Sequence, residues 1–274
     1  SNYELAAQEY VPYHTSMRKV LVCIVAIGIL VPALSLFQKP VAPLQKSSDN
    51  PSPTISRSPT LVSESLDIVQ NEKKFRITWL PVRDLSTLTL IPNFTHKRIA
   101  RSLIDTKECT HVINGGFYTT DYQPTGLFVA QGKTLRTTNP NALLNGYFVI
   151  EPDNTASIQY APPESSVRIA LQTGPILMKG GSPVKLAIRD DEPDRRVGLG
   201  VTKNGSVIFF VTYDPENTWS GPRLADMPNM VSKILSQLSL TDAINLDGGS
   251  ASAFIRGDFS LQELVSVGSF FCVQ

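Results

Sequence analysis

Residues 244–254 read INLDGGSASAF, a short apolar run that meets Asp247, two glycines, small residues and then an aromatic. Asp-Gly is a strong signal for a two-residue hairpin turn, because both turn positions need a positive φ that Asp and Gly tolerate. The two glycines also leave backbone N–H groups uncovered beside the carboxylate, and such groups can hold an anion. The stretch alone therefore predicts a plain hairpin turn or a hairpin turn that is also a binding site.

The residues just before this stretch have the period of a helix. Between residues 223 and 240, apolar side chains recur at spacings of three and four, which predicts an amphipathic helix. Asp226 precedes Met227 and Pro228, and proline suits the first helical turn, where an N–H would have no partner. We expect the helix to lead into a short strand at residues 243–246.

The rest of the chain from Phe75 onward has mostly the patterns of strands. Residues 85–92 alternate between apolar and polar side chains, and hairpins are predicted at residues 145–161 and 195–214. Residues 167–181 predict a strand that breaks where Gly174 meets Pro175. The pattern indicates the α+β class, with a mixed, largely antiparallel sheet packed with few helices in a single domain.

Four segments are expected along the chain. Residues 1–19 form a polar tail, 20–37 an uncharged apolar segment, 38–62 a linker rich in Pro and Ser, and 63–274 the folded domain. Basic residues directly precede the apolar segment, which is typical of a signal peptide or an uncleaved membrane anchor. We therefore expect export, with the domain periplasmic, extracellular or tethered to the outer face of the cytoplasmic membrane.

Composition and short motifs exclude several functions. The 274 residues carry a formal net charge of +1 without a Lys/Arg cluster, so nucleic acid is not an expected partner. Membrane contact is expected only through residues 20–37. Neither HExxH nor GxSxG is present, so the zinc-protease and α/β-hydrolase classes lose their main support. Cys109 and Cys272 lie in the domain, where an oxidising compartment permits a disulfide or two separate buried thiols.

Three glycine-bearing turns follow predicted strands. They are NGGFY at residues 114–118, QTGP at 172–175 and NLDGGS at 245–250. If the three strands are neighbours, the turns lie along one edge of the sheet, where uncovered N–H groups could hold phosphate oxygens. Each turn taken singly is more often a plain connection, so the prediction depends on their occurring together.

Charged side chains near these turns supply further candidates. Arg195 and Arg196 open a strand after the acidic loop RDDEPD; Arg195 is expected to pair with an acidic neighbour, whereas Arg196 could grip a phosphate. Asp247 and Asp214 end apparent strands, and paired carboxylates are the usual equipment for cleaving a glycosidic bond. Asp214 also fits a simple Asp-Pro turn. With Asp121, these carboxylates could instead bind Ca²⁺ or Mg²⁺, but no EF-hand spacing supports a metal site.

Taken in chain order, four motifs resemble those of the phosphodiester glycosidase family. They are INGGFYTTDYQPTGLFVAQGK at 113–133, LQTGPILMKGG at 171–181, RRVGLGV at 195–201 and, after the helix, AINLDGGSASAF at 243–254. The resemblance covers about residues 75–273. It implies a single catalytic domain without a cofactor. That domain would hydrolyse the bond between a phosphodiester and the anomeric carbon of a sugar, here of the N-acetylglucosamine type.

The resemblance also implies a set of site residues. The catalytic set would be Asp247, Arg196 and Asn114, with Asp214 as the reserve carboxylate. Arg196 and glycine N–H groups would bind the phosphodiester, while Asp247 would act as a base on water or stabilise an oxocarbenium-like centre. Asn114 or Asn245 would orient sugar hydroxyls. The substrate-binding residues would be Gly115, Gly116, Thr173, Gly174, Asn245, Gly248, Gly249 and Ser250.

Two departures from the family pattern bear on substrate identity. The family often has DGGGS where this chain has DGGS at residues 247–250, and R-T-A-x-G where it has RVGLG at 196–200. The alternative function is a non-catalytic binder of envelope phospho-glycans, in which DGGS is only a turn. An Arg196→Ala variant separates the two, because a binder has no turnover to lose.

Overall fold

The computed structural model describes residues 64–274. The expected polar tail, apolar segment and linker lie outside the described residues. Within 64–274, no helix combines the length and apolar character needed to cross a membrane.

The largest sheet has seven strands. It contains the strand that was expected to follow the helix and one of the predicted hairpins. Its order is β1 (Ser65–Gln70), β2 (Lys73–Val82), β13 (Val207–Tyr213), β12 (Arg196–Thr202), β14 (Leu240–Asn245), β10 (Ile176–Lys179) and β11 (Ser182–Pro183). Every pairing in it is antiparallel. β12 and β13 form the predicted hairpin, and Gly205 in its turn has φ +80°.

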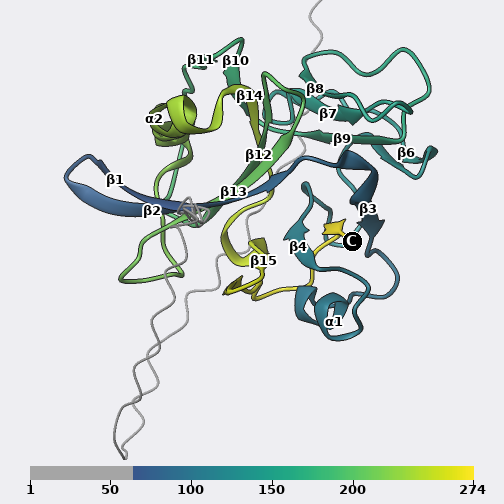
Figure 1. The fold of residues 1–274 in the computed structure, drawn as a ribbon, viewed down its shortest axis with the longest axis horizontal. Helices are drawn as coiled ribbons and strands as arrows, with labels where there is room; N and C mark the ends of the chain where they lie inside the picture. The colour runs from purple at the N-terminus through teal and green to yellow at the C-terminus, as the bar shows by residue number, and fades with distance from the viewer. Residues whose placement is uncertain (1–63) are drawn as a thin grey trace, which may run out of the picture. The chain divides into compact units, whose positions relative to one another are not determined.

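Two further antiparallel sheets have five strands each. One is ordered β16 (Phe259–Leu261), β15 (Phe254–Arg256), β4 (His111–Asn114), β17 (Ser269–Val273) and β3 (Leu88–Pro92). The other is ordered β6 (Lys133–Arg136), β5 (Phe128–Ala130), β9 (Ile169–Thr173), β7 (Gly146–Ile150) and β8 (Ala156–Gln159). In Figure 1, β7, β8 and β9 lie above β3 and β4, and β13 and β12 run beside both groups. The predicted α+β class and largely antiparallel pairing are confirmed.

The main core lies where the three sheets meet. Phe209 of β13, Phe148 of β7 and Phe271 of β17 come from different sheets and are fully buried. The ring centroid of Phe271 lies 5.0 Å from that of Phe209 and 5.7 Å from that of Phe148. Aromatic contacts of this kind add to the burial of apolar area and lock the sheets together.

A second core lies on the opposite face of the seven-stranded sheet, under α2 (Met227–Leu238). The helix buries Met227, Met230, Val231 and Ile234 against side chains of the sheet, including Trp79. These four positions recur at spacings of three and four, so the predicted amphipathic stripe is confirmed as the packed face. The 3₁₀ turn η2 (Leu224–Asp226) leads directly into the helix.

Two short helical elements lie outside the sequence prediction. Residues 85–92 form the 3₁₀ turn η1 (Leu85–Thr87) before β3, rather than one strand. The side chain of Asp84 accepts a hydrogen bond from the N–H of Ser86, which favours a turn there. The helix α1 (Ala100–Asp105) has only six residues, too few for a clear helical period.

The predicted DGGS hairpin is wrong. β14, before the turn, pairs with β12 and β10, whereas β15, after it, belongs to another sheet and pairs with β4 and β16. β14 is already flanked on both sides, so the following strand has no edge to join and the chain crosses to the next sheet. A 3₁₀ turn, η3 (Gly249–Ala251), occupies the crossing.

A disulfide settles the open question about the two domain cysteines. Cys109 and Cys272 are bonded across 163 residues of sequence, and both are buried. Cys272 lies on β17 and Cys109 precedes β4, its neighbour in the sheet. The bond therefore ties the C-terminal strand to the segment that leads into the NGGFY turn.

Candidate active site

The three glycine-bearing turns meet, although their strands lie in three different sheets. β4, β9 and β14 end in NGGFY, QTGP and NLDGGS respectively, and no two of these strands are neighbours. The condition for the turns to line one edge of one sheet, that their strands are neighbours, is therefore not met. The turns converge instead because all three strands end at the junction between the sheets. There, side chains of the turns form hydrogen bonds from one turn to another.

Asn114 joins the NGGFY turn to the DGGS turn. Its Nδ2 donates to the carbonyl oxygens of Asp247 at 2.8 Å and Gly115 at 3.1 Å, and its Oδ1 accepts from the N–H of Ala253 at 3.0 Å. The side chain is fully buried. Because the amide is engaged by backbone on both sides, this arrangement positions the turns and leaves a sugar hydroxyl little room to compete.

Thr173 and Asn245 join the QTGP turn to the same junction. The hydroxyl of Thr173 donates to the carbonyl of Asn245 at 2.8 Å, and Nδ2 of Asn245 donates to the carbonyl of Gly174 at 3.0 Å. Both side chains are buried. Among the described residues no donor reaches Oδ1 of Asn245, so this buried acceptor is unpaired there.

Close approach explains the two glycines of DGGS. A Cβ at residue 248 would lie 2.8 Å from the carbonyl oxygen of Arg195, and one at residue 249 would lie 2.5 Å from Oδ2 of Asp194. Gly249 also has φ +60°. A larger residue at either position would clash with the segment that carries the two arginines.

The expected free N–H groups are not found at three of the glycines. The N–H of Gly248 donates to Oδ1 of Asp247 at 2.9 Å, and that of Gly249 donates to the carbonyl of Arg195 at 2.9 Å. The N–H of Gly115 donates to the carbonyl of Ser269 at 2.9 Å. The acceptors are the carboxylate of the turn itself, the residue just before β12 and the first residue of β17, so these N–H groups hold the turns in place rather than face outward.

Arg195 supports the turn from one side. Its guanidinium donates to the carbonyl of Gly249 from Nε at 3.3 Å and Nη2 at 3.1 Å, and to the carbonyl of Gln262 at 3.2 Å. It also lies 4.7 Å from the ring centroid of Trp219. Burial lowers the pKa of Arg195 to about 10, which still leaves the group charged at neutral pH.

Arg196 also lies against the turn, where a Cβ on Gly248 would be 3.8 Å from its Cδ. Nε donates to the carbonyl of Pro222 at 3.1 Å, while Nη2 lies 3.2 Å from Oδ1 of Asp191 and donates to the carbonyl of Glu192. The side chain is 15% exposed. These contacts fix the guanidinium beside the turn.

Asp247 is the carboxylate at the centre of the junction. Its pKa is raised to about 7: burial and, less strongly, the nearby Asp194 carboxylate raise it, whereas the Gly248 N–H and the charge of Arg196 lower it. Near neutral pH the group therefore exists in both protonation states. A carboxyl tuned in this way suits proton transfer in a reaction.

Other predicted residues lie outside this junction or contribute backbone only. Oδ1 of Asp214 accepts from the N–H groups of Glu216 at 2.9 Å and Asn217 at 3.3 Å, so its carboxylate caps its own loop. Ser250 is exposed in η3, and its carbonyl accepts from Leu264. Within residues 64–274, no group of three or more His, Cys, Asp or Glu side chains is arranged to hold a metal ion.

Three residues near the junction were not singled out from the sequence. Asp194 contacts the glycine turn, Asp191 holds Arg196, and Trp219 lies beside Arg195. The two aspartates belong to the acidic loop RDDEPD, whose position directly before the paired arginines was the available signal. No pattern in the sequence distinguishes Trp219, because its proximity depends on the path of the loop after β13.

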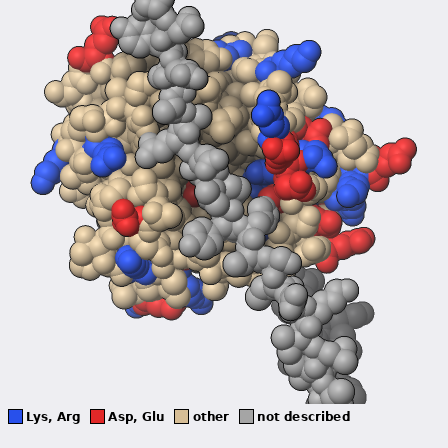
Figure 2. Space-filling model, turned by 180° about the vertical axis from the view of Figure 1, so that it is seen from behind, with Lys and Arg blue, Asp and Glu red and all other residues tan. Residues whose placement is uncertain are grey.

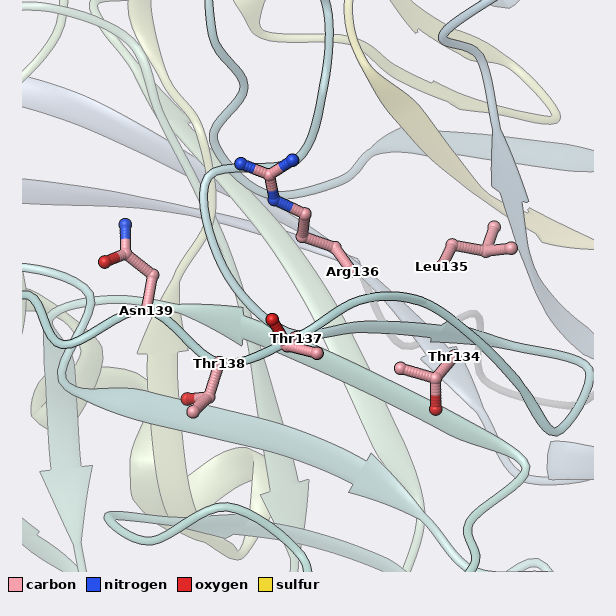
Figure 3. Close-up of a pocket in the computed structure, with 6 residues that line it drawn as sticks. All are labelled: Thr134, Leu135, Arg136, Thr137, Thr138 and Asn139. Atoms are coloured by element: carbon pink, nitrogen blue, oxygen red, sulfur yellow. The ribbon is translucent and has the colours of Figure 1, made fainter.

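A surface hollow lies next to the QTGP strand but contains none of the predicted site residues. It has a volume of about 490 Å³ and is lined by residues 134–139, which Figure 3 shows as β6 and the segment that follows it. This segment is attached to β9 through Gln172, whose Nε2 donates to the carbonyl of Asn139 at 2.6 Å. In this segment, Arg136 points away from Thr134 and Thr138 (Figure 3).

Charge is mixed on the face of the molecule that Figure 2 shows. Figure 2 shows blue and red side chains interspersed among tan ones on the visible part of that face, with no basic stripe.

The chain is similar to known proteins in both sequence and structure. Residues 107–270 match the family model of the phosphodiester glycosidases. The Escherichia coli K12 protein YigE, described as uncharacterized, is 22% identical over 156 residues, which are 53% of this chain and 58% of YigE. The chain thus spans little more than half the length of that relative.

Two solved structures share the fold. The catalytic domain of zebrafish N-acetylglucosamine-1-phosphodiester alpha-N-acetylglucosaminidase, auto-inhibited by its pro-peptide, has a TM-score of 0.62 at 18% identity. The similarity covers 80% of this chain and 85% of that one. A hypothetical protein from Synechocystis has a TM-score of 0.54 at 12% identity, covering 77% and 61% of the two chains.

The family match spans more than half of the chain. The chain therefore belongs to the phosphodiester glycosidase family.

Proposed function

We propose that this chain hydrolyses the glycosidic bond of a sugar phosphodiester, with a sugar of the N-acetylglucosamine type. The observation that carries the proposal is the position of Asp247. Its carboxyl group lies at the junction of three turns beside Arg196, and its pKa is about 7. Membership of the phosphodiester glycosidase family supports the reaction class.

The proposed reaction breaks the bond between the anomeric carbon and the phosphate oxygen. Water attacks the anomeric carbon while Asp247 takes its proton, and the phosphomonoester leaves with the electron pair of the broken bond. Phosphate is a good leaving group, so Arg196 needs only to bind and stabilise its charge. We assign this contact to Nη1 of Arg196, since Nε and Nη2 bond to the protein.

The proposal gives the buried amides a supporting part. Asn114 and Asn245 hold the three turns in register, so they position Asp247 instead of contacting the sugar. Asp214 stays a turn residue in this scheme, because its carboxylate caps the loop after β13.

An Asp247→Asn variant tests the assignment. Wild type and variant are incubated with UDP-N-acetylglucosamine and with the methyl-phosphate diester of N-acetylglucosamine, and free sugar is measured. Loss of general-base catalysis predicts a decrease in turnover of about 100-fold or more. Asp258→Asn is the matched control, since that side chain is 91% exposed, and its turnover should stay at the wild-type value.

Turnover retained by Asp247→Asn would remove Asp247 from the reaction. Binding of the diester by the wild type without any release of sugar would favour the phospho-glycan binder instead.

We also infer that the domain works outside the cytoplasm. The bond between Cys109 and Cys272 supports this, since disulfides persist in oxidising compartments, and so does the apolar segment expected at residues 20–37. Resistance of both cysteines to alkylation in cells, until a reductant is added, is the expected result, whereas free thiols in the folded protein would contradict it.

A further inference from the structure

Trp219 is an exposed aromatic side chain beside the candidate active site. It is 54% exposed, whereas Trp79, the other tryptophan of the chain, is 2% exposed. We infer that Trp219 is a stacking platform for the sugar ring of the substrate, an inference that rests on the proposed function. None of the motifs that define the site includes this residue.

The loop that carries Trp219 is held in place by its own hydrogen bonds. It runs from β13 to η2, and the N–H of Asp214 donates to the carbonyl of Ser220 at 2.9 Å. The N–H of Trp219 itself donates to Oδ1 of Asn217 at 3.3 Å. The indole is thus presented to solvent from a braced loop, which reduces the entropy lost when a ligand packs on it.

The loop also packs directly on the segment that carries the arginines. A Cβ at Gly221 would lie 2.3 Å from the carbonyl oxygen of Asp194, so the two backbones are in close contact. The N–H of Asp194 donates to the carbonyl of Pro222 at 3.4 Å. The residues directly after Trp219 are therefore packed against the segment that leads to Arg196.

One side chain connects the indole to the glycine turn. The guanidinium of Arg195 lies 4.7 Å from the ring centroid of Trp219 and donates to the carbonyl of Gly249 from two of its nitrogens. This cation–π contact fixes the orientation of the indole relative to the turn. Because Gly249 is two residues from Asp247, the platform borders the proposed reaction centre.

Sugar rings match this surface chemically. The C–H groups on a face of a pyranose are apolar and carry slight positive charge, while the face of an aromatic ring is negative. An exposed indole with a fixed orientation can therefore bind a sugar face while the phosphodiester reaches Arg196. A nucleobase could also stack on an indole, so the test uses a substrate that has a single ring.

Steady-state kinetics with the methyl-phosphate diester of N-acetylglucosamine gives the first test. Replacement of Trp219 by Ala should raise KM about tenfold with little change in kcat, because a ground-state contact is lost. Trp219→Phe should retain part of the affinity. The matched control is Tyr160→Ala, which removes an aromatic side chain of similar exposure, 53%, and should leave KM unchanged.

Tryptophan fluorescence gives a second test that does not need turnover. Trp79 is buried, so a saturable change in emission on addition of the diester, or of N-acetylglucosamine 1-phosphate, should come from Trp219. The change is expected in the Asp247→Asn variant and should be absent when Trp219→Phe is added to it.

The outcomes separate this inference from the proposed function. Hydrolysis with the same KM in Trp219→Ala and wild type overturns the platform and leaves the reaction in place. Trp219-dependent binding without hydrolysis supports the platform and overturns the reaction. An absence of any saturable fluorescence change with both glycosyl phosphates overturns the platform, whatever the chain hydrolyses.

Discussion

At the scale of single residues, Asp247 combines a structural burden with a proposed chemical task. Asp247 is partly buried, and desolvation is the main cause that raises its pKa from an ordinary value of 3.8 to about 7. The folded protein therefore holds this proton more tightly than the unfolded chain does. The free energy of unfolding decreases through this group as pH rises from 3.8 to about 7. Over that range the carboxyl group ionises in the unfolded chain but stays largely protonated in the folded protein, which favours unfolding.

This titration predicts two pH dependences. The kcat/KM of the proposed hydrolysis should rise as pH increases through about 7, since the ionised form of Asp247 acts as the base. Over the same range Asp247→Asn should gain thermal stability relative to wild type, because it has no carboxyl to ionise. Thermal unfolding at pH 5 and pH 8, with Asp258→Asn as control, measures the second effect. An equal difference in unfolding temperature between Asp247→Asn and wild type at both pH values would contradict it.

Residue patterns predicted which turns come together better than they predicted the hydrogen bonds that those turns make. The sequence indicated that Asn114, Thr173 and Asp247 belong together, and the structure brings their turns into contact. It predicted free N–H groups at the glycines, but those of Gly248 and Gly249 are occupied. Which acceptor a backbone N–H finds depends on chain segments distant in sequence, and no local pattern reports it.

At the scale of elements, the start of α2 controls the position of Arg196. Asp191 is 9% exposed and accepts from the N–H groups of Leu224 at 2.9 Å and Ala225 at 2.8 Å, while its Oδ1 also lies 3.2 Å from Nη2 of Arg196. One carboxylate thus caps the 3₁₀ turn that begins the helix and fixes the arginine.

Asp191→Ala should therefore affect both stability and activity. Loss of the cap and of a buried ion-pair partner is expected to cost about 1–3 kcal/mol of unfolding free energy, measured by urea denaturation. Turnover should fall as Arg196 loses its anchor. Asp226→Ala is the control, because that side chain lies in the same turn and accepts hydrogen bonds from Gln70 and Asn71 at the end of β1. Unchanged stability in Asp191→Ala would show that the cap is dispensable.

The sequence located elements well and their sheets poorly. It indicated a break at Gly174-Pro175, and the chain does break there, between β9 and β10. That the break transfers the chain from a five-stranded sheet to the seven-stranded one could not be predicted. Strand periodicity specifies which face is buried, whereas the choice of partner is made by non-local packing.

At the scale of the whole molecule, the three sheets share a hydrophobic core, and a disulfide joins two segments that are distant in the sequence. Cys109 and Cys272 join segments 163 residues apart in the sequence, and all three turns of the site lie between them along the chain. A crosslink over so long a loop restricts the unfolded chain strongly, although the size of the effect depends on native geometry as well.

Removal of this disulfide should lower stability without changing the site. The double variant Cys109→Ala, Cys272→Ala is expected to lose about 2–5 kcal/mol of unfolding free energy. Denaturation with and without a reductant provides the comparison, since reductant should lower the stability of wild type and leave the double variant unaffected. Equal stability of both proteins in oxidising buffer would contradict the prediction.

The central claim is that the chain breaks the bond at the anomeric carbon of a sugar phosphodiester. Hydrolysis of the methyl-phosphate diester of N-acetylglucosamine in ¹⁸O-labelled water, followed by mass spectrometry of both products, tests it directly. Attack of water on the anomeric carbon predicts that the label appears in the released sugar and that the phosphomonoester carries none. Label in the phosphate would mean that the phosphorus–oxygen bond is broken instead and would contradict the assignment of a glycosidase.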